Sequence, residues 1–494
     1  MKKLQLFSLA FLFLLSANSG AAQEVKKLTF DEVIELSETQ STLALIARNR
    51  FRASYWQYRS FQAQYRPSLR LSGTTPDYNN LLQRQFRPSD SSYYYIQTNT
   101  INNLGSLALS QNIGPTGTVI SLNTSLTLEK DIKKDAPINY VATPVSINIT
   151  QPVRSYNSLK WDKKIEPKQY EQAKKTYLAA IEEVHMSAVQ TFFRLAMAQI
   201  GKQIAVMNLS NSDTLYRIAD GRYGLGTIAE DELLQMQLSY LNAETDSKTA
   251  DMNLRDAEIR LRSFLGFNDN VQLELILPTD IPDLQVDKNQ ALNLAMENNP
   301  DILGYDLNVL NAQSNVAQAK ATKGLTASIT ASLGLNQQST IFADAYQHMN
   351  NSQRVKLQFA VPILDWGEGR GKYKMALSNL ELAEVQANQN RVDFQQNLFL
   401  DVEQFNLQKN QVEIAAKSDT VAMRMFEVTK QRFMIGKIAI LDLNNADTRK
   451  DTNRRAYVQS LQNYWNYFYN LRSLTLFDFI NNKPLETDYE SLLE

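Results

Sequence analysis

The feature that most constrains this chain is a turn-like motif that occurs twice. The first copy, RYGLGTIAEDELLQMQ, begins at Arg222, and the second, RFMIGKIAILDLNNAD, begins at Arg432, so the offset is 432 − 222 = 210 residues. The same offset relates Pro152 to Pro362, each of which closes an alternating apolar and polar run. An offset kept between separate motifs indicates internal duplication. We therefore predict two copies of one unit, each built as strand, long helix, tight turn and long helix.

Long helices are predicted on either side of each turn. Proline is absent between Pro167 and Pro278 and again between Pro362 and Pro484, and proline-free stretches of this length favour helices. The returning helices also carry apolar residues that alternate in steps of four and three, the spacing of a coiled-coil seam. These residues are Tyr457, Leu461, Tyr464, Phe468 and Leu471 in the second copy and Leu254, Ala257, Leu261 and Phe264 in the first.

Four runs alternate apolar with small polar residues, as half-exposed strands do. Their apolar members are Ile120, Leu122, Leu126 and Leu128; Val145, Ile147 and Ile149; Ala327, Ile329, Ala331, Leu333 and Leu335; and Val355, Leu357, Phe359 and Val361. The ordinary interpretation is an antiparallel sheet that covers a soluble core. The Ser, Thr and Asn of the other face suit a water-filled lumen, and each run is close to the roughly 9–11 residues that cross a bilayer as a strand. Because about eight strands are needed to close a barrel, four strands imply that several chains share one.

The first copy carries extra residues. Pro67 and Leu325 are 325 − 67 = 258 apart, so 258 − 210 = 48 residues are inserted, mostly within 72–118. The insert is expected to form either an outer loop or an additional hairpin near the rim of the barrel. The loops 129–142 and 336–353 are expected to face the outside.

The N-terminus has the pattern of a secretion signal. Lys2 and Lys3 precede an apolar run from Leu4 to Leu15, and cleavage is predicted near Ala22. The run is too short for a membrane-spanning helix, which needs about 20 apolar residues. The chain has no cysteine, so we expect neither disulfides nor a lipidated N-terminal cysteine.

Taken together, these motifs resemble the TolC-like outer-membrane efflux proteins. The aromatic-x-x-Gly turn followed by LD is similar to that family's second-repeat signature, and GLGTIAEDEL is similar to its first-repeat turn. Further similarities are QPV at Gln151, VPILDWGEGR at Val361 and ALNLAMENNPDI at Ala291. The resemblance implies a homotrimer with four strands per chain in a 12-stranded β-barrel, continued by a long α-helical coiled-coil barrel. It also implies an outer-membrane location with a large periplasmic part.

The resemblance assigns a domain order and a function. The expected segments are 1–22 as signal peptide, 23–265 as repeat 1, 266–289 as an inter-repeat equatorial segment, 290–476 as repeat 2 and 477–494 as a C-terminal equatorial segment. The implied function is that of an exit duct, which passively conducts substrates from an inner-membrane transporter and a periplasmic adaptor. Substrate and pump class are left open.

The site residues are expected at the turns. The resemblance implies that the turns form a periplasmic tip that contacts the adaptor, and the residues assigned to it are Gly224, Gly226, Thr227, Arg432, Gly436 and Lys437. It also places two aspartates, three residues apart, around the entrance of the pore. Asp442 matches the first position, whereas Asn445 departs from the pattern at the second, and Glu232 is assigned to the constriction with them. The simpler alternative is that Asp442 only favours the start of the returning helix.

Other functional classes have little support in the sequence. A formal charge of −1 gives no indication of a nucleic-acid surface. His185 and His348 are the only histidines and have no metal-ligand spacing around them, so no metal or cofactor is expected. GEGRGKY at Gly367 lacks the spacing of a phosphate-binding loop. The alternatives are a soluble periplasmic coiled-coil adaptor, which leaves the amphipathic strands unexplained, and an enzyme with helical insertions.

Overall fold

The computed structural model describes residues 24–132, 136–267, 271–438 and 440–493. The predicted signal peptide and its cleavage near Ala22 lie outside these residues. The chain divides into two compact units. The sheet unit comprises residues 52–173 and 301–392, and the helical unit comprises the described residues of 1–51, 174–300 and 393–494.

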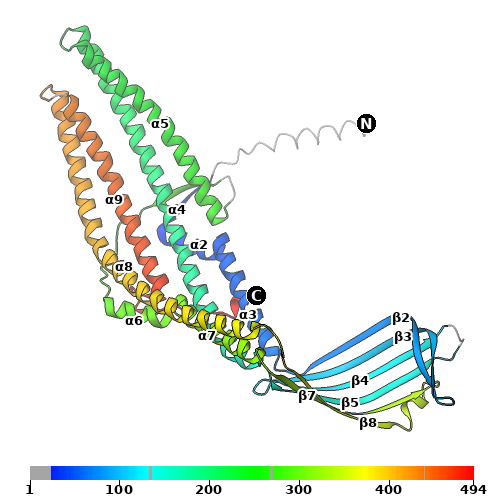
Figure 1. Ribbon diagram of the computed structural model, residues 1–494. Coiled ribbons are helices and arrows are strands. Elements are labelled where there is room, and N and C mark those ends of the chain that lie inside the picture. Colours follow the sequence, from blue (N-terminus) through cyan, green and yellow to red (C-terminus); the bar gives the residue numbers. More distant parts are fainter. Residues whose placement is uncertain (1–23, 133–135, 268–270, 439, 494) are drawn as a thin grey trace, which may run out of the picture. The chain divides into compact units, whose positions relative to one another are not determined.

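The sheet unit contains one antiparallel sheet of six strands in the order β2-β3-β4-β5-β7-β8. The strands are β2 (Ser68–Arg87), β3 (Ser92–Ile113), β4 (Thr118–Asp131), β5 (Asn139–Arg154), β7 (Thr326–Ser339) and β8 (Asn350–Ala360). The last four contain the alternating runs expected from the sequence. The predicted count of four strands per chain is corrected to six, because the insert adds one hairpin to the strands of the first half of the chain, the second of the two forms expected for it (Figure 1).

The register aligns the apolar residues of all strands on one face of the sheet. Leu109 of β3 lies opposite Leu122 of β4, and Leu122 lies opposite Ile147 of β5. On the other face, Ser121 lies opposite Asn148. Because side chains alternate between faces along a strand, each such pair fixes the face of its neighbours. The sheet therefore has one apolar and one polar face.

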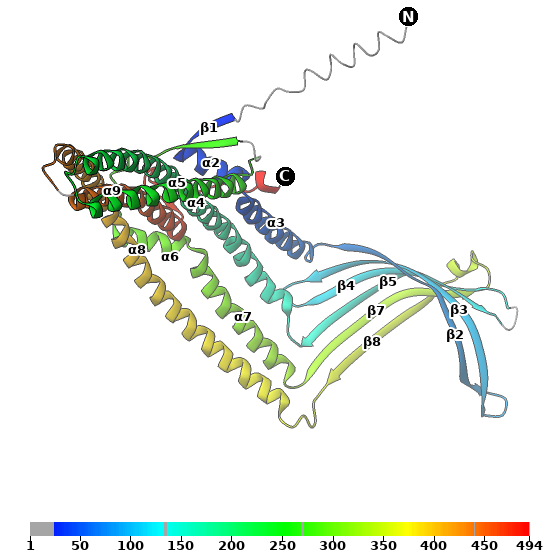
Figure 2. The same cartoon turned by 90° about the horizontal axis from the view of Figure 1, so that it is seen from above.

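Strands β2 and β3 continue past the other strands. Their pairing runs to Arg87↔Ser92, whereas the pairing of β3 with β4 ends at Thr100↔Asp131. Residues 80–87 and 92–99 thus form a two-stranded ribbon beyond the sheet (Figure 2). Aromatic residues pack on it, with the rings of Phe86 and Tyr93 5.1 Å apart.

The long helices have matching lengths in the two halves of the chain. Helices α4 (Ser158–Gly224) and α8 (Glu368–Met434) each have 67 residues. Helices α5 (Glu230–Leu265) and α9 (Ile440–Thr475) each have 36. Every boundary recurs at the offset of 210 residues. A 67-residue helix is about 100 Å long at ~1.5 Å per residue, as the proline-free stretches predicted.

Shorter elements complete the chain. They are β1 (Glu24–Thr29), α2 (Phe30–Gln40), α3 (Thr42–Ala63), β6 (Val271–Ile276), α6 (Lys288–Asn298), α7 (Pro300–Thr322), η1 (Asp344–Tyr346), β9 (Phe477–Asp478), β10 (Lys483–Pro484) and η2 (Ser491–Leu493). Strand β1 pairs in parallel with β6. Thr29 caps α2 in a capping box with Glu32, which satisfies backbone N–H groups at the start of the helix.

The core of the helical unit lies where these shorter elements meet the long helices. Phe192 and Phe193 of α4 and Tyr464 of α9 are fully buried there, and the ring of Phe30 lies 5.4 Å from that of Phe192. Burying an aromatic side chain contributes roughly 1.5–3 kcal/mol each, so this cluster anchors the bases of both helical hairpins. The predicted domain boundaries stay a prediction, since each compact unit combines segments from both halves of the chain.

Within the described part of the chain, no helix has both the length and the hydropathy that would let it span a bilayer.

Candidate functional site at the helical turns

The two turns between the long helices have the same backbone geometry. Gly226 has φ +70° and Gly436 has φ +72°, a left-handed conformation that favours glycine. Gly226 N–H donates to the carbonyl of Tyr223 (2.8 Å) and Thr227 N–H to that of Arg222 (3.0 Å). This pair of bonds is the Schellman arrangement, which satisfies the last carbonyls of a helix and reverses the chain.

The second turn repeats these bonds. Gly436 N–H donates to the carbonyl of Phe433 (2.9 Å) and Lys437 N–H to that of Arg432 (3.0 Å). The glycines are needed for the positive φ and not for space, because a Cβ at Gly436 would meet no atom within 4 Å. Sequence motif and geometry therefore agree: the turns are sharp reversals set by the backbone.

The residues assigned to the tips lie at the surface. Gly224, Gly226, Thr227, Arg432, Gly436 and Lys437 are all exposed. Between them each turn carries a large apolar residue, Leu225 with 80% and Ile435 with 65% of its surface exposed. Arg222 donates from Nη2 to the carbonyl of Met434 at 3.4 Å and thereby joins the two turns. Each turn therefore presents one large apolar side chain to the outside.

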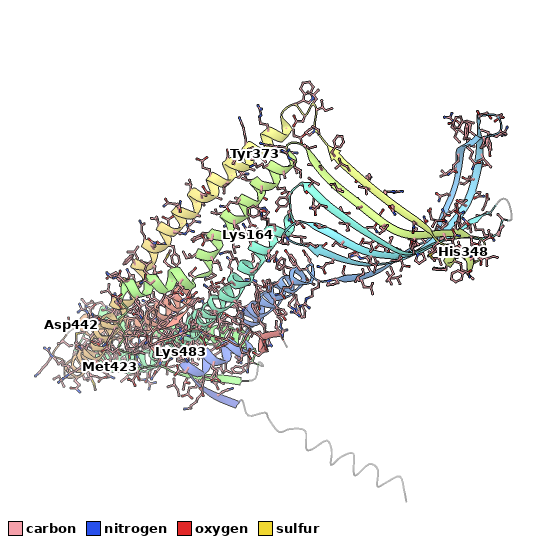
Figure 3. The ribbon with its side chains drawn as sticks, turned by 90° about the horizontal axis from the view of Figure 1, so that it is seen from below. Lys164, His348, Tyr373, Met423, Asp442 and Lys483 are labelled. Atoms are coloured by element: carbon pink, nitrogen blue, oxygen red, sulfur yellow. The ribbon has the colours of Figure 1, made fainter. Side chains whose placement is uncertain are left out.

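The residues assigned to the constriction share an exposed face. Asp442 and Asn445 lie in the first two turns of α9 and are exposed, whereas the residue after each of them, Leu443 and Ala446, is buried. Figure 3 labels Asp442 at this end of the long helices. Glu232 occupies the matching place in the first turn of α5 and is also exposed. A carboxylate in the first helical turn is favourable by itself, so the placement agrees with both sequence interpretations of Asp442.

A buried lysine joins the two hairpins. Lys450 of α9 has only 2% of its surface exposed, and its Nζ lies 2.6 Å from Asp447 Oδ1 and 3.3 Å from Asp451 Oδ1. Asn208 of α4 donates from Nδ2 to Asp451 Oδ2 at 2.7 Å. Burial raises the pKa of Asp447, and Lys450 partly offsets the shift. The ion pairs lie within α9, and the hydrogen bond from Asn208 of α4 links this buried cluster to the other hairpin.

A second buried ionic cluster lies at the base of the hairpins. His185 Nδ1 lies 3.3 Å from Glu182 Oε2, and its Nε2 lies 3.7 Å from Glu38 Oε2. Arg472 contacts Glu182 Oε1 at 2.9 Å and Asp478 Oδ2 at 3.2 Å. Burial lowers the pKa of His185, but contact with the two carboxylates outweighs it and holds the pKa above the ordinary value. The same contact lowers the pKa of Glu38.

Sequence reasoning missed both clusters. Lys450 and His185 are single residues on helices, and each cluster is completed by residues from distant segments, Asn208 for Lys450 and Glu38 for His185. The only local signals are the spacings of Lys450 after Asp447 and of His185 after Glu182, each three residues on a helix. In the residues that the structure describes, no group of three or more His, Cys, Asp or Glu side chains is placed to hold a metal ion.

The geometry defines a class of protein. Helical hairpins of this length, which end in paired glycine turns, combined with a sheet that has one apolar face, are the parts of an outer-membrane duct with a periplasmic extension.

The comparisons with known proteins agree. The family model "Outer membrane efflux protein" matches residues 121–267 and 291–475, which together are more than half of the chain. The chain belongs to the outer membrane efflux protein family. It is an outer-membrane efflux channel of the TolC-like type, located in a Gram-negative outer membrane with a large periplasmic part, as the sequence motifs predicted. The comparison with curated proteins gave no match.

Solved structures share the fold. The CmeC outer membrane channel of Campylobacter jejuni has 15% sequence identity and a TM-score of 0.66, and the match covers 94% of this chain and 88% of that one. VceC of Vibrio cholerae has 14% identity and a TM-score of 0.62, with coverage of 92% and 97%. The open MtrE channel of Neisseria gonorrhoeae has 14% identity and a TM-score of 0.52, with coverage of 93% and 91%. The mixed fold of long helices and a curved sheet is thereby confirmed.

Proposed function

We propose that three copies of this chain form one continuous duct, which receives its cargo from an inner-membrane transporter through a periplasmic adaptor. The observation that carries the proposal is the sheet. Its apolar face is exposed on every strand, and its two edge strands, β2 and β8, are exposed along almost their whole length. Unpaired strand edges are not tolerated in lipid, so the sheet needs further copies to close.

In this assembly the two turns are the adaptor contact. Leu225 and Ile435 offer apolar surface beside Thr227 and Lys437, and the Arg222 contact holds both turns together. The carboxylates of Asp442 and Glu232 line the periplasmic entrance of the pore, with Asn445 one helical turn further on. Conduction is passive, and the energy for transport comes from the inner-membrane transporter.

Site-specific crosslinking in cells tests the adaptor contact. The chain has no cysteine, so Thr227→Cys or Lys437→Cys provides a unique thiol at one turn. Each variant is expected to form a covalent product with the adaptor in the presence of a short bifunctional reagent. Glu381→Cys, also exposed but about 80 Å from the turn along α8 at ~1.5 Å per residue, is the control and is expected to form none. Adaptor products from Glu381→Cys alone would exclude the turns as the contact.

A further inference from the structure

The sheet has two strands more than the four that the family resemblance implied. β2 follows α3 as β7 follows α7, and β5 precedes α4 as β8 precedes α8, so in the strand order β3 and β4 form the additional hairpin. We propose that β3 and β4 are membrane-spanning strands of the barrel wall, so that three copies close a barrel of 3 × 6 = 18 strands. The inference rests on the threefold assembly proposed above. It further requires that β8 of each copy pairs with β2 of the next.

The pairing places the hairpin in the plane of the sheet. β3 pairs with β4 without interruption from Thr100↔Asp131 to Ile113↔Thr118. β4 then pairs with β5 from Val119↔Thr150 to Glu129↔Asn139, with one irregularity. A hairpin folded over the rim would leave β2 beside β5 and would not form both ladders. Strands β3 and β4 are therefore inserted between β2 and β5 and widen the sheet.

The hairpin continues the apolar face at the same level of exposure. Leu109 and Leu122 of the inserted strands have 42% and 45% of their surface exposed, and Ile147 of β5 has 44%. These three residues lie in one row across the sheet. Whatever covers Ile147 must therefore also cover Leu109 and Leu122, and for an outer-membrane strand the cover is lipid. β4 has 14 residues, more than the roughly 9–11 that a spanning strand needs.

The charged residues of the sheet lie on its polar face, the face that would line a water-filled lumen. Apart from the ribbon and the strand ends, the charged residues in the described part of the sheet are Arg70 and Asp77 of β2 and Arg354 and Lys356 of β8. All four lie on the polar face. Arg354 is opposite Ser332 and Lys356 opposite Thr330, while Arg70 is opposite Ala108, between Ser106 and Ser110, and Asp77 is opposite Asn102. A cation on the lipid face is destabilising, most strongly at the membrane midplane. Between their ends, β3 and β4 carry no cation on the apolar face.

Because the number of inserted strands is even, the edge strands of neighbouring copies can still pair and close the barrel. β2 runs away from the helical end of the sheet and β8 runs towards it, as they would with four strands (Figure 1). The two edges therefore remain antiparallel to each other between neighbouring copies. Since barrel diameter grows roughly linearly with strand number, 18 strands give a lumen about 1.5 times as wide as 12. The membrane exit would then not limit the cargo, and selection would fall to the helical part.

Nitroxide labels at matched positions of β4 and β5 test the inference. Leu122→Cys and Ser121→Cys lie on opposite faces of β4, and their direct partners Ile147→Cys and Asn148→Cys lie on β5. In the full-length protein in lipid vesicles, accessibility to oxygen reports lipid and accessibility to a water-soluble nickel chelate reports the lumen. We expect position 122 to match position 147 and position 121 to match position 148.

The controls separate this inference from the proposed function. Water exposure at both 121 and 122, with alternation retained at 147 and 148, would place the hairpin outside the membrane and overturn the 18-stranded barrel alone. Loss of alternation at 147 and 148 as well would overturn the membrane-spanning sheet itself. A variant in which residues 82–97 are replaced by a two-residue Asn-Gly turn removes only the ribbon, because Leu81 lies opposite Thr98. This variant is expected to leave the oxygen and nickel accessibilities of all four labels unchanged. A changed accessibility at 121 or 122 would show that β4 needs the ribbon to hold its place in the barrel wall.

Electron cryomicroscopy of the assembly in lipid nanodiscs gives the strand number directly. Eighteen strands around the lumen are expected. Twelve strands, with β3 and β4 outside the wall, would contradict the inference and leave the threefold duct intact.

Discussion

The two halves of this chain are alike in their helices and unlike in their strands. α4 and α8 have the same length, as do α5 and α9, and both turns have a glycine near φ +70°. The sheet, by contrast, takes four strands, β2 to β5, from the first half and two, β7 and β8, from the second. The two halves of the chain therefore keep the same helix lengths but differ in the number of strands.

A physical reason accounts for the difference. One residue added to a helix rotates every later side chain by about 100° and moves it ~1.5 Å along the axis. The apolar seam and the contact of Arg222 with Met434 would then be lost. A hairpin added to an antiparallel sheet leaves both chain ends on the same side and every ladder bond satisfied. Membrane strands can thus be added in pairs, while the hairpins must keep their register.

The largest expected effect is a loss of efflux when either turn is changed, because the two turns have the same geometry in both halves of the chain. Gly226→Pro and Gly436→Pro should each abolish most of the efflux, because proline is fixed near φ −65° and cannot take the positive φ. The assembly should still reach the outer membrane, and adaptor crosslinking should fall in parallel with efflux. Gly221→Ala, in the last helical turn of α4 without a positive φ and with no atom near its Cβ, is the control and should behave normally. Normal efflux in both proline variants would remove the turns from the mechanism.

The next effect concerns the link between the hairpins. Lys450→Met should destabilise the helical unit by about 3–5 kcal/mol, because it leaves the carboxylates of Asp447 and Asp451 without their buried cation. Lys248→Met removes the same charge from an exposed pair with Glu244 and should leave stability unchanged. Thermal unfolding in one detergent compares the two variants. Equal melting temperatures would show that the Lys450 cluster does not hold the hairpins together.

These residues also show where sequence reasoning ended. Periodicity found β4, β5, β7 and β8, and the duplicated motif found the turns, because both depend on neighbours in the chain. The strand number was missed because β3 alternates less regularly, with Gly105 and Asn102 within it. The clusters around Lys450 and His185 were missed because Asn208 and Glu38, which complete them, come from distant segments that no local pattern reveals.

A smaller, pH-dependent effect is expected at the base of the hairpins. The raised pKa of His185 means that its contribution is fully present below the unfolded value of 6.5 and is lost as the pH rises through the folded value. The lowered pKa of Glu38 means that its contribution is present above 4.5 and is lost as the pH falls through the folded value. The stabilisation is therefore greatest between about pH 4.5 and 6.5.

His185→Asn tests this window. The difference in melting temperature between the wild-type protein and this variant should be largest within it and should shrink at alkaline pH. His348→Asn, at an exposed loop position with φ +49° that asparagine tolerates, is the control and should follow the wild-type profile. A difference for His185→Asn that stays constant from pH 5 to 9 (about the range that imidazole titration covers) would rule out the ionic contribution.

The smallest expected effect compares the entrance residues of the two halves. Asp442→Ala and Glu232→Ala should each reduce a modest cation selectivity, since carboxylates around a pore attract counter-ions. Asn445→Asp should strengthen block by multivalent cations, because it adds a second carboxylate on the same helix face. Reversal potentials of single channels under a salt gradient measure both effects. If Asp442→Ala changes neither selectivity nor block, Asp442 acts only at the helix start.

The account depends most directly on the sheet, whose apolar face and open edges cannot be satisfied in one chain. The decisive measurement is the mass of the protein extracted from outer membranes in mild detergent, by native mass spectrometry. Three times the mass of one mature chain is expected, with the strand content retained. A stable monomer that keeps its full strand content would show that the sheet does not need other copies, and would contradict the shared barrel.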